Sequence, residues 1–304
     1  MAAETPALQI ESVYLPFKGT DQLHMRRFSL GGEGVPVFLL HGSIENGRIF
    51  YSESGKGFAP WLAQQGFDVF VADMRGRGRS TPPIGRGSRH GADELMEEEI
   101  PAFLQGIHAV KGVVPIHFVS HSWGGVDFLA YLARPAYPVE VKSMTFFGTK
   151  RHISVRNLRY YWMVGFGWNI LSPVIIRRRG YLDAVRYRMG SDNISGPVFY
   201  DTNHWVRSPD WYHWKDRFDY RAAFNKMQLP PTLYLAGKND HVLGHPIDVL
   251  RLADETGSHQ VKRVHVLSRA NGNRHDYGHI DMLTHPDAQQ DHFPMVLDWM
   301  RQNA

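Results

Sequence analysis

Residues 115–133 read Pro115-Ile116-His117-Phe118-Val119-Ser120-His121-Ser122-Trp123-Gly124-Gly125-Val126-Asp127-Phe128-Leu129-Ala130-Tyr131-Leu132-Ala133. An apolar run ends at Val119, small residues surround a serine, and a helical apolar pattern begins at Val126. This succession is typical of a strand that turns sharply into a helix, with the serine held on the strained turn. Ser122 is therefore the candidate nucleophile.

A strand and a helix approach each other closely at such a turn, so the flanking residues must be small. Gly124 meets this need two residues after the serine. Ser120 stands two residues before it, where the G-x-S-x-G pattern has glycine. Because serine–glycine clusters also form ordinary turns, the motif is weak by itself and needs support from the rest of the chain.

Length and composition limit the possible domain organisation and the possible kinds of active site. A chain of 304 residues can form one α/β domain with an inserted subdomain. Its 43% hydrophobic and 21% charged residues are ordinary for a globular protein. The absence of cysteine excludes disulfides, thiolate metal sites and a cysteine nucleophile.

Targeting patterns are missing from the sequence. The first six residues have neither a basic nor an apolar region of a signal peptide. No apolar run reaches the ~18 residues that a membrane span needs. We therefore expect a cytoplasmic protein.

Strand and helix patterns alternate along most of the chain. Predicted strands lie at 8–15, 22–30, 35–40, 68–72, 115–119, 139–147, 231–236 and 262–267. Predicted helices lie at 58–65, 92–110, 126–133, 246–255 and 287–300. This alternation predicts an α/β fold with a doubly wound, mostly parallel, eight-stranded sheet, in which the first two strands are antiparallel.

The alternation stops between residues 149 and 229. This stretch is rich in tryptophan and carries the basic run Arg177-Arg178-Arg179. An irregular insert between two halves of an α/β core is typical of a helical cap. We therefore predict a core formed by residues 1–148 and 230–304, with a cap or lid at 149–229.

Acyl transfer needs a nucleophile, a base, an acid that orients the base, and donors for the oxyanion. Asp240 follows the predicted strand 231–236, and His279 lies in the loop after the last predicted strand. Each would lie at the carboxyl end of a strand, where α/β sheets place their ligand sites. We predict Ser122, Asp240 and His279 as the catalytic residues. Weaker alternatives for the base are His121, His241 and His275.

Two backbone N–H groups, those of Ser43 and Trp123, are the predicted oxyanion donors. His41 lies next to a buried strand, so we interpret it as an orienting or packing residue rather than a catalytic one. The predicted substrate-binding residues are His41, Gly42, His121, Trp162 and Trp168. We expect neither a metal nor an organic cofactor.

These motifs make the chain resemble enzymes of the α/β-hydrolase fold over nearly its whole length apart from the cap. The matching pieces are His41-Gly42-Ser43, Asp73-x-Arg75-Gly76-x-Gly78-x-Ser80, the turn at Ser122, Asp240, and Gly278-His279-Ile280-Asp281. Two further stretches resemble acid-lipase-type esterases. These are Gly237-x-x-Asp240-x-Val242-Leu243, continued by Pro246-x-Asp248-Val249-x-x-Leu252, and His279-x-Asp281-x-Leu283.

The resemblance implies a serine hydrolase that cleaves small-molecule carboxylic esters, with an apolar acyl chain, through an acyl-enzyme. A serine at this turn argues against epoxide hydrolases and haloalkane dehalogenases, which need a carboxylate there. A thioesterase or a carbon–carbon bond hydrolase would use the same three residues. A lyase and a non-catalytic binding protein of the same fold also stay open.

The cap gives the only indication of a partner. Arginines alternate with aromatic residues between positions 150 and 188. The simpler interpretation is a cap that packs its aromatics on the core and exposes its arginines. The more specific interpretation is an apolar tunnel for the acyl chain with a cationic rim, which would make weak contact with an anionic membrane surface. No nucleic-acid-binding module is recognisable, so we expect no nucleic-acid partner. The oligomeric state stays open.

Overall fold

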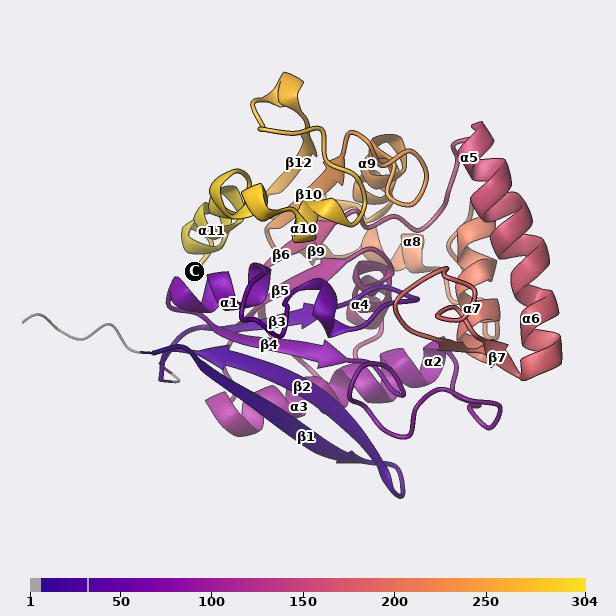
Figure 1. The fold of residues 1–304 in the computed structure, drawn as a ribbon. Coiled ribbons are helices and arrows are strands. Elements are labelled where there is room, and N and C mark those ends of the chain that lie inside the picture. The colour runs from indigo at the N-terminus through magenta and orange to yellow at the C-terminus, as the bar shows by residue number, and fades with distance from the viewer. Residues whose placement is uncertain (1–6, 32) are drawn as a thin grey trace, which may run out of the picture.

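The computed structural model describes residues 7–31 and 33–304 and contains an eight-stranded sheet (Figure 1). The strand order is β1-β2-β4-β3-β5-β6-β10-β12. Antiparallel pairing joins β1 to β2 and β2 to β4, and all other neighbours are parallel. This sheet confirms the predicted fold class. Its strands are β1 (Gln9–Phe17), β2 (Asp21–Ser29), β3 (Pro36–Leu40), β4 (Asp68–Asp73), β5 (Ile116–His121), β6 (Val141–Phe147), β10 (Thr232–Gly237) and β12 (Lys262–Leu267).

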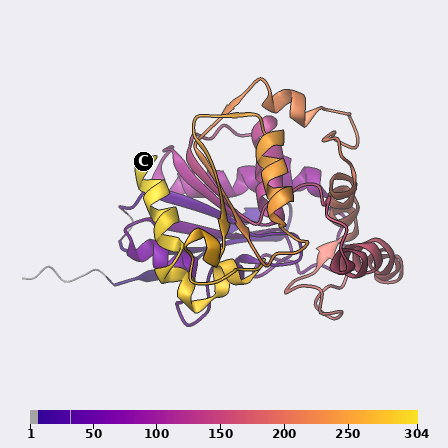
Figure 2. The same ribbon diagram turned by 90° about the horizontal axis from the view of Figure 1, so that it is seen from above.

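Helices cover both faces of the sheet, as Figures 1 and 2 show. On one face α1 (Phe58–Gln64) and α11 (Phe293–Gln302) pack with the side chains of Val37 and Leu39. On the other face α3 (Ile100–Lys111), α4 (Trp123–Ala133) and α9 (Pro246–Glu255) share a core with Phe38 and Leu40. Successive residues of β3 thus face opposite cores, which explains why its sequence is apolar without alternation.

Two helices differ in detail from the sequence prediction. The helix predicted at 92–110 consists of α2 (Ala92–Glu94), a π-helical segment η2 (Leu95–Glu99) and α3, with Pro101 in the first turn of α3. The helix predicted at 287–300 is interrupted instead. A 3₁₀ segment η5 (Pro286–Gln290) precedes α11, which starts at Phe293 with Pro294 in its first turn. Proline has no N–H to donate, so it interrupts the α-helical hydrogen-bond pattern, and a new α-helical segment starts next to each of these prolines.

Residues 158–179 form one long helical stretch in the region between β6 and β10. It consists of α5 (Leu158–Tyr160), a π-helical segment η3 (Tyr161–Leu171) and α6 (Ser172–Arg179). Figure 1 shows it at the side of the molecule toward which β4 points. The other elements of this region are β7 (Tyr181–Leu182), β8 (Ile194–Ser195), α7 (Gly196–Arg207), α8 (Tyr220–Phe224) and β9 (Gln228–Leu229). The division into core and cap stays a prediction.

Hydrogen bonds tie this region to loops of the sheet. The carboxylate of Asp192 accepts from the side-chain amide of Asn46 and from the backbone N–H of Gly78, at 3.1 and 2.6 Å. Asp201 accepts from the N–H of Ala92, at 3.0 Å. These bonds hold the region against the loops that follow β3 and β4.

The remaining short elements are η1 (Gly47–Ile49), β11 (Ser258–His259), η4 (Arg269–Asn271) and α10 (Asp281–Thr284). Among the residues described, no helix is both long enough and apolar enough to cross a membrane.

Candidate active site

Ser122 lies on a strained turn between β5 and α4. Its backbone has φ 52° and ψ −123°, a region that residues other than glycine rarely adopt. A Cβ atom at position 124 would lie 2.4 Å from the carbonyl oxygen of His41, so only glycine fits there. A Cβ at position 125 would lie 2.6 Å from the Oγ of Ser120. The second glycine therefore makes room for the serine that departs from the usual pattern.

The structure brings Ser122, His279 and Asp240 together. The Nε2 atom of His279 lies 2.9 Å from the Oγ of Ser122, and its Nδ1 atom lies 2.5 Å from the Oδ2 of Asp240. Because a carboxylate accepts the Nδ1 proton, Nε2 of the neutral ring can accept the hydroxyl proton of Ser122. This is the geometry of a nucleophile, a base and an acid that orients the base.

Electrostatics set the protonation states of the pair. Burial lowers the pKa of His279 below its usual 6.5, although Asp240 opposes this shift. Burial alone would raise the pKa of Asp240, but the charge of His279 and its hydrogen bond lower it to about 2. At neutral pH the carboxylate is therefore charged and the imidazole is neutral, as a general base must be.

The predicted oxyanion donors lie next to the nucleophile. Trp123 is the first residue of α4, so its backbone N–H has no acceptor within the helix. The loop after β3 lies close by, because a Cβ on Gly42 would be 3.0 Å from the Cβ of Ser122. The buried guanidinium of Arg77 donates to the carbonyls of Gly42 and Ser43, at 3.0 and 2.7 Å. Arg77 thereby fixes the loop that carries the Ser43 N–H.

An ion pair between His121 and Glu45 supports the candidate active site. Nδ1 of His121 lies 2.6 Å from Oε1 of Glu45, and its Nε2 lies 2.9 Å from the carbonyl oxygen of His279. Both partners accept only, so both ring nitrogens donate and His121 is an imidazolium. Burial alone would raise the pKa of Glu45, but His121 lowers it to about 2. The same carboxylate accepts from the N–H of Gly42, so it links the loop after β3 to the His279 loop.

Two residues predicted to bind substrate, His121 and His41, make other contacts in this structure. His121 has no exposed surface, and both of its nitrogens are bound within the protein, so it supports the site instead of facing a substrate. His41 is equally buried. Its Nδ1 donates to the carbonyl of Gly42, and its Nε2 accepts from the N–H of Met74. The orienting role predicted for His41 fits these bonds better than substrate contact.

The two tryptophans of the predicted pocket lie on the long helix. Trp162 is 70% exposed and stacks on Phe166, with ring centroids 5.3 Å apart. Trp168 packs against Phe199, with ring centroids 4.9 Å apart. None of these contacts involves the triad, so substrate binding by Trp162 and Trp168 stays a prediction.

Lys150 is an unexpected buried charge near the site. Lys150 is only 5% exposed, and its Nζ lies 5.8 Å from the centre of the Trp123 ring. Two residues earlier, a Cβ on Gly148 would lie 3.0 Å from the ring of His279. The carboxylates whose charges act on this ammonium are those of Asp240, Asp248 and Glu45. Burial lowers the pKa of Lys150 to about 8, although Asp240, Asp248 and Glu45 oppose the shift.

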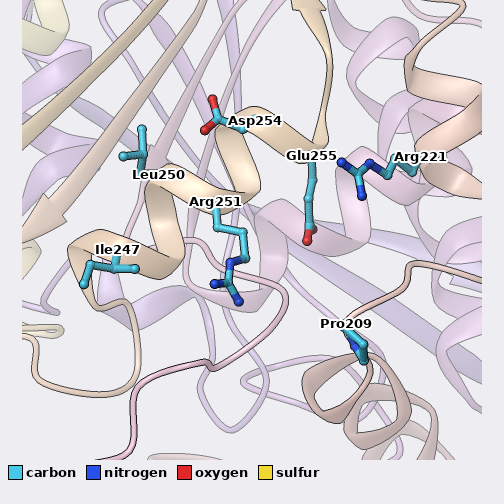
Figure 3. A pocket seen from close by; sticks show the side chains of 7 residues that line it. All are labelled: Pro209, Arg221, Ile247, Leu250, Arg251, Asp254 and Glu255. Atoms are coloured by element: carbon cyan, nitrogen blue, oxygen red, sulfur yellow. The ribbon is translucent and has the colours of Figure 1, made fainter.

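Three other features of the described residues could bind a ligand or act as a base, but no contact with Ser122 is found for them. His275, His285 and Asp287 bring their ligand atoms within 4.8 Å of one another, so they could hold a metal ion, but His275 already bonds to Asp287. The remaining alternative base, His241, accepts through its carbonyl from Asn157. A pocket of about 430 Å³ lies along α9 (Figure 3). The residues that line this pocket are Pro209, Arg221, Ile247, Leu250, Arg251, Asp254 and Glu255. None of them belongs to the triad.

Comparison with known proteins agrees with this fold. Residues 35–172 match the family model described as alpha/beta hydrolase fold. The sheet order and the turn at Ser122 agree with this match, so the chain has the α/β-hydrolase fold.

Individual relatives are distant. A proline iminopeptidase of Lactobacillus delbrueckii subsp. lactis is 27% identical over 137 residues, which are 45% of this chain and 43% of that protein. The aligned part thus spans less than half of the relative's length. The structure is similar to a 2-hydroxy-6-oxo-6-phenylhexa-2,4-dienoate hydrolase of Rhodococcus sp. strain RHA1, with TM-score 0.60, 16% identity and coverage of 97% and 100% of the two chains. It is also similar to an esterase of Pyrococcus furiosus, with TM-score 0.58, 14% identity and coverage of 97% and 93%.

Proposed function

We propose that this protein is a serine hydrolase that cleaves carboxylic esters through an acyl-enzyme. The observation that carries the proposal is the chain of contacts from Ser122 through His279 to Asp240, at 2.9 and 2.5 Å. The strained backbone of Ser122 supports it further, because strain of this kind persists where the surrounding structure enforces it.

The mechanism follows from the roles of these atoms. Nε2 of His279 accepts the proton of the Ser122 hydroxyl as Oγ attacks the ester carbonyl. Asp240 holds the ring orientation and stabilises the imidazolium that forms. The N–H groups of Trp123 and Ser43 hold the oxyanion, and one such donor is worth about 3–4 kcal/mol of transition-state stabilisation. The imidazolium then protonates the leaving alcohol, and a water molecule activated by the same histidine releases the acid.

Esters are the substrate class that we propose, because an alkoxide or phenoxide leaves more readily than an amide nitrogen or a carbon. Proteins to which this chain is similar also include a proline iminopeptidase and a thioesterase domain. A thioester, a carbon–carbon bond or a proline peptide is therefore an outcome that the test has to distinguish.

The test is hydrolysis of 4-nitrophenyl esters from acetate to palmitate, compared with an acyl thioester and proline 4-nitroanilide. Ser122→Ala, Asp240→Asn and His279→Ala are the variants. We expect ester turnover that falls by orders of magnitude in all three. Equal turnover in the wild type and Ser122→Ala would refute the mechanism, whereas turnover of the thioester or the anilide alone would replace the substrate class.

A further inference from the structure

The long helical stretch 158–179 exposes an unusual amount of apolar surface. Leu158 is 88% exposed, Trp162 70% and Ile170 57%. With Phe166 and Val174, these residues are spaced by four, so they follow one side of the helix. Tyr161 and Met163 beside them are also exposed. We call the surface formed by Leu158, Tyr161, Trp162, Met163, Phe166, Ile170 and Val174 the outer helix face.

The opposite side of the same helix is used for packing. Val164, Ile175 and Ile176 are buried, and Trp168 contacts Phe199 of α7. The helix is thus anchored to the protein along one side. Asn157 caps its start by accepting from the N–H of Tyr160, and Gly180 ends it in the left-handed conformation. The outer helix face is therefore a fixed surface. Scattered exposed apolar residues are ordinary, but a contiguous apolar patch on one element marks an interaction site.

Charge indicates what covers this face. No aspartate or glutamate occurs between residues 158 and 179. Exposed arginines stand at both ends of the stretch, Arg156 and Arg159 at the first and Arg177 and Arg178 at the last. Arg179 is paired with Asp183 at 3.0 Å, so its charge is partly compensated. An apolar face with cations at both ends complements a surface that has an apolar interior and anionic headgroups.

Aromatic residues on the face fit the same partner. Tryptophan and tyrosine favour the boundary between headgroups and acyl chains, because their rings are apolar and their polar atoms stay hydrated. Tyr161 is 59% exposed and Trp162 is 70% exposed, and both belong to the outer helix face. No helix in the described ranges is suited to cross a bilayer, so such contact would place this one in the plane of the membrane.

We propose that the outer helix face docks onto a membrane surface that contains anionic lipids. Docking would place the region between β6 and β10 against the membrane (Figure 1). Esters dissolved in the membrane would then be the substrates nearest to Ser122. This last step rests on the proposed function, whereas the docking itself does not.

The test is flotation of the full chain with vesicles of phosphatidylcholine alone or with phosphatidylglycerol added. One variant carries Trp162→Ser, Phe166→Ser and Ile170→Ser, and another carries Arg177→Gln and Arg178→Gln. The matched control changes three other exposed apolar residues elsewhere on the protein, as Val113→Ser, Ile247→Ser and Leu250→Ser. Circular dichroism checks that each variant is folded.

We expect the wild type and the control to float with phosphatidylglycerol vesicles. The vesicle partition coefficient should fall at least tenfold in the apolar variant, and it should fall in the arginine variant and at high salt. Ser122→Ala should float like the wild type, which separates docking from catalysis. Absence of the wild type from anionic vesicles, or an equal loss in the control, would overturn the proposal. The proposal would also be overturned if no form of the protein floated and sedimentation showed a wild-type dimer that the apolar variant does not form.

Discussion

Replacing Lys150 with methionine should make the protein more stable. Lys150 is only 5% exposed and desolvation lowers its pKa, so the folded state bears the cost of partly desolvating the ammonium. Methionine is unbranched and apolar, so it can occupy the path of the lysine stem without a charge.

The magnitude follows from the pKa of this group. Burial lowers that pKa from 10.5 to about 8. At 1.36 kcal/mol per pKa unit, the charged lysine costs the folded state about 3 kcal/mol at pH 7. This cost is fully present below pH 8. It is lost as pH rises toward 10.5, because the folded protein then releases the proton before the unfolded chain does.

The assay is urea unfolding at pH 7 and pH 9.5. Lys150→Met should exceed the wild type in free energy of unfolding by about 3 kcal/mol at pH 7, and by less than half of that at pH 9.5. Lys238→Met is the matched control, because Lys238 is exposed in the turn that leads to Asp240. It should change stability by less than about 0.5 kcal/mol. A Lys150→Met protein that is no more stable than the wild type at pH 7 would refute the reasoning.

Three further outcomes follow from the site. Asp240→Asn should lower kcat by about 10⁴-fold, measured with a 4-nitrophenyl ester, since the amide no longer fixes the tautomer of His279; a loss below tenfold would contradict this role. The plot of kcat/KM against pH should rise to a plateau with a midpoint below 6.5, because burial lowers the pKa of His279; a midpoint above 6.5 would oppose it. Glu45→Ala should lower the free energy of unfolding by about 3–5 kcal/mol, since it leaves the His121 charge buried without its partner. Because the pKa of Glu45 is lowered from 4.5 to about 2, the wild type should lose the stability that the ion pair contributes as pH falls through this range. Urea unfolding of the wild type and Glu45→Ala between pH 4.5 and 2 measures this loss.

Local patterns were sufficient to predict the sheet and the positions of the three candidate catalytic residues. Strand and turn residues identify each strand end, and the carboxyl ends of parallel strands meet at one edge of the sheet. Ser122, Asp240 and His279 each follow a strand of this kind. Their mutual contacts therefore follow from topology, although the distances do not.

Contacts that depend on strand order could not be predicted in the same way. Glu45 follows β3 and His121 ends β5, and these strands are neighbours only because the sheet runs β4-β3-β5. No local pattern in the sequence states this order, so His121 looked like a substrate contact. The burial of Lys150 is hidden for the same reason, since it depends on how the chain after β6 packs between Trp123 and the His279 loop.

The long helix illustrates a different limit. Its residues are apolar on nearly every side, so the pattern does not distinguish the packed side from the exposed one. Ile175 and Ile170 have the same chemistry, yet one is buried and the other is 57% exposed. Tertiary packing alone decides between them.

The central claim is that Ser122 is an activated nucleophile, and covalent labelling tests it most directly. The protein would be treated with a fluorophosphonate, and the modified peptide would be identified by mass spectrometry. We predict one adduct, on Ser122, which is absent in Ser122→Ala and forms much more slowly in His279→Ala. A folded wild type that stays unlabelled, or that is labelled equally fast in His279→Ala, would contradict the account.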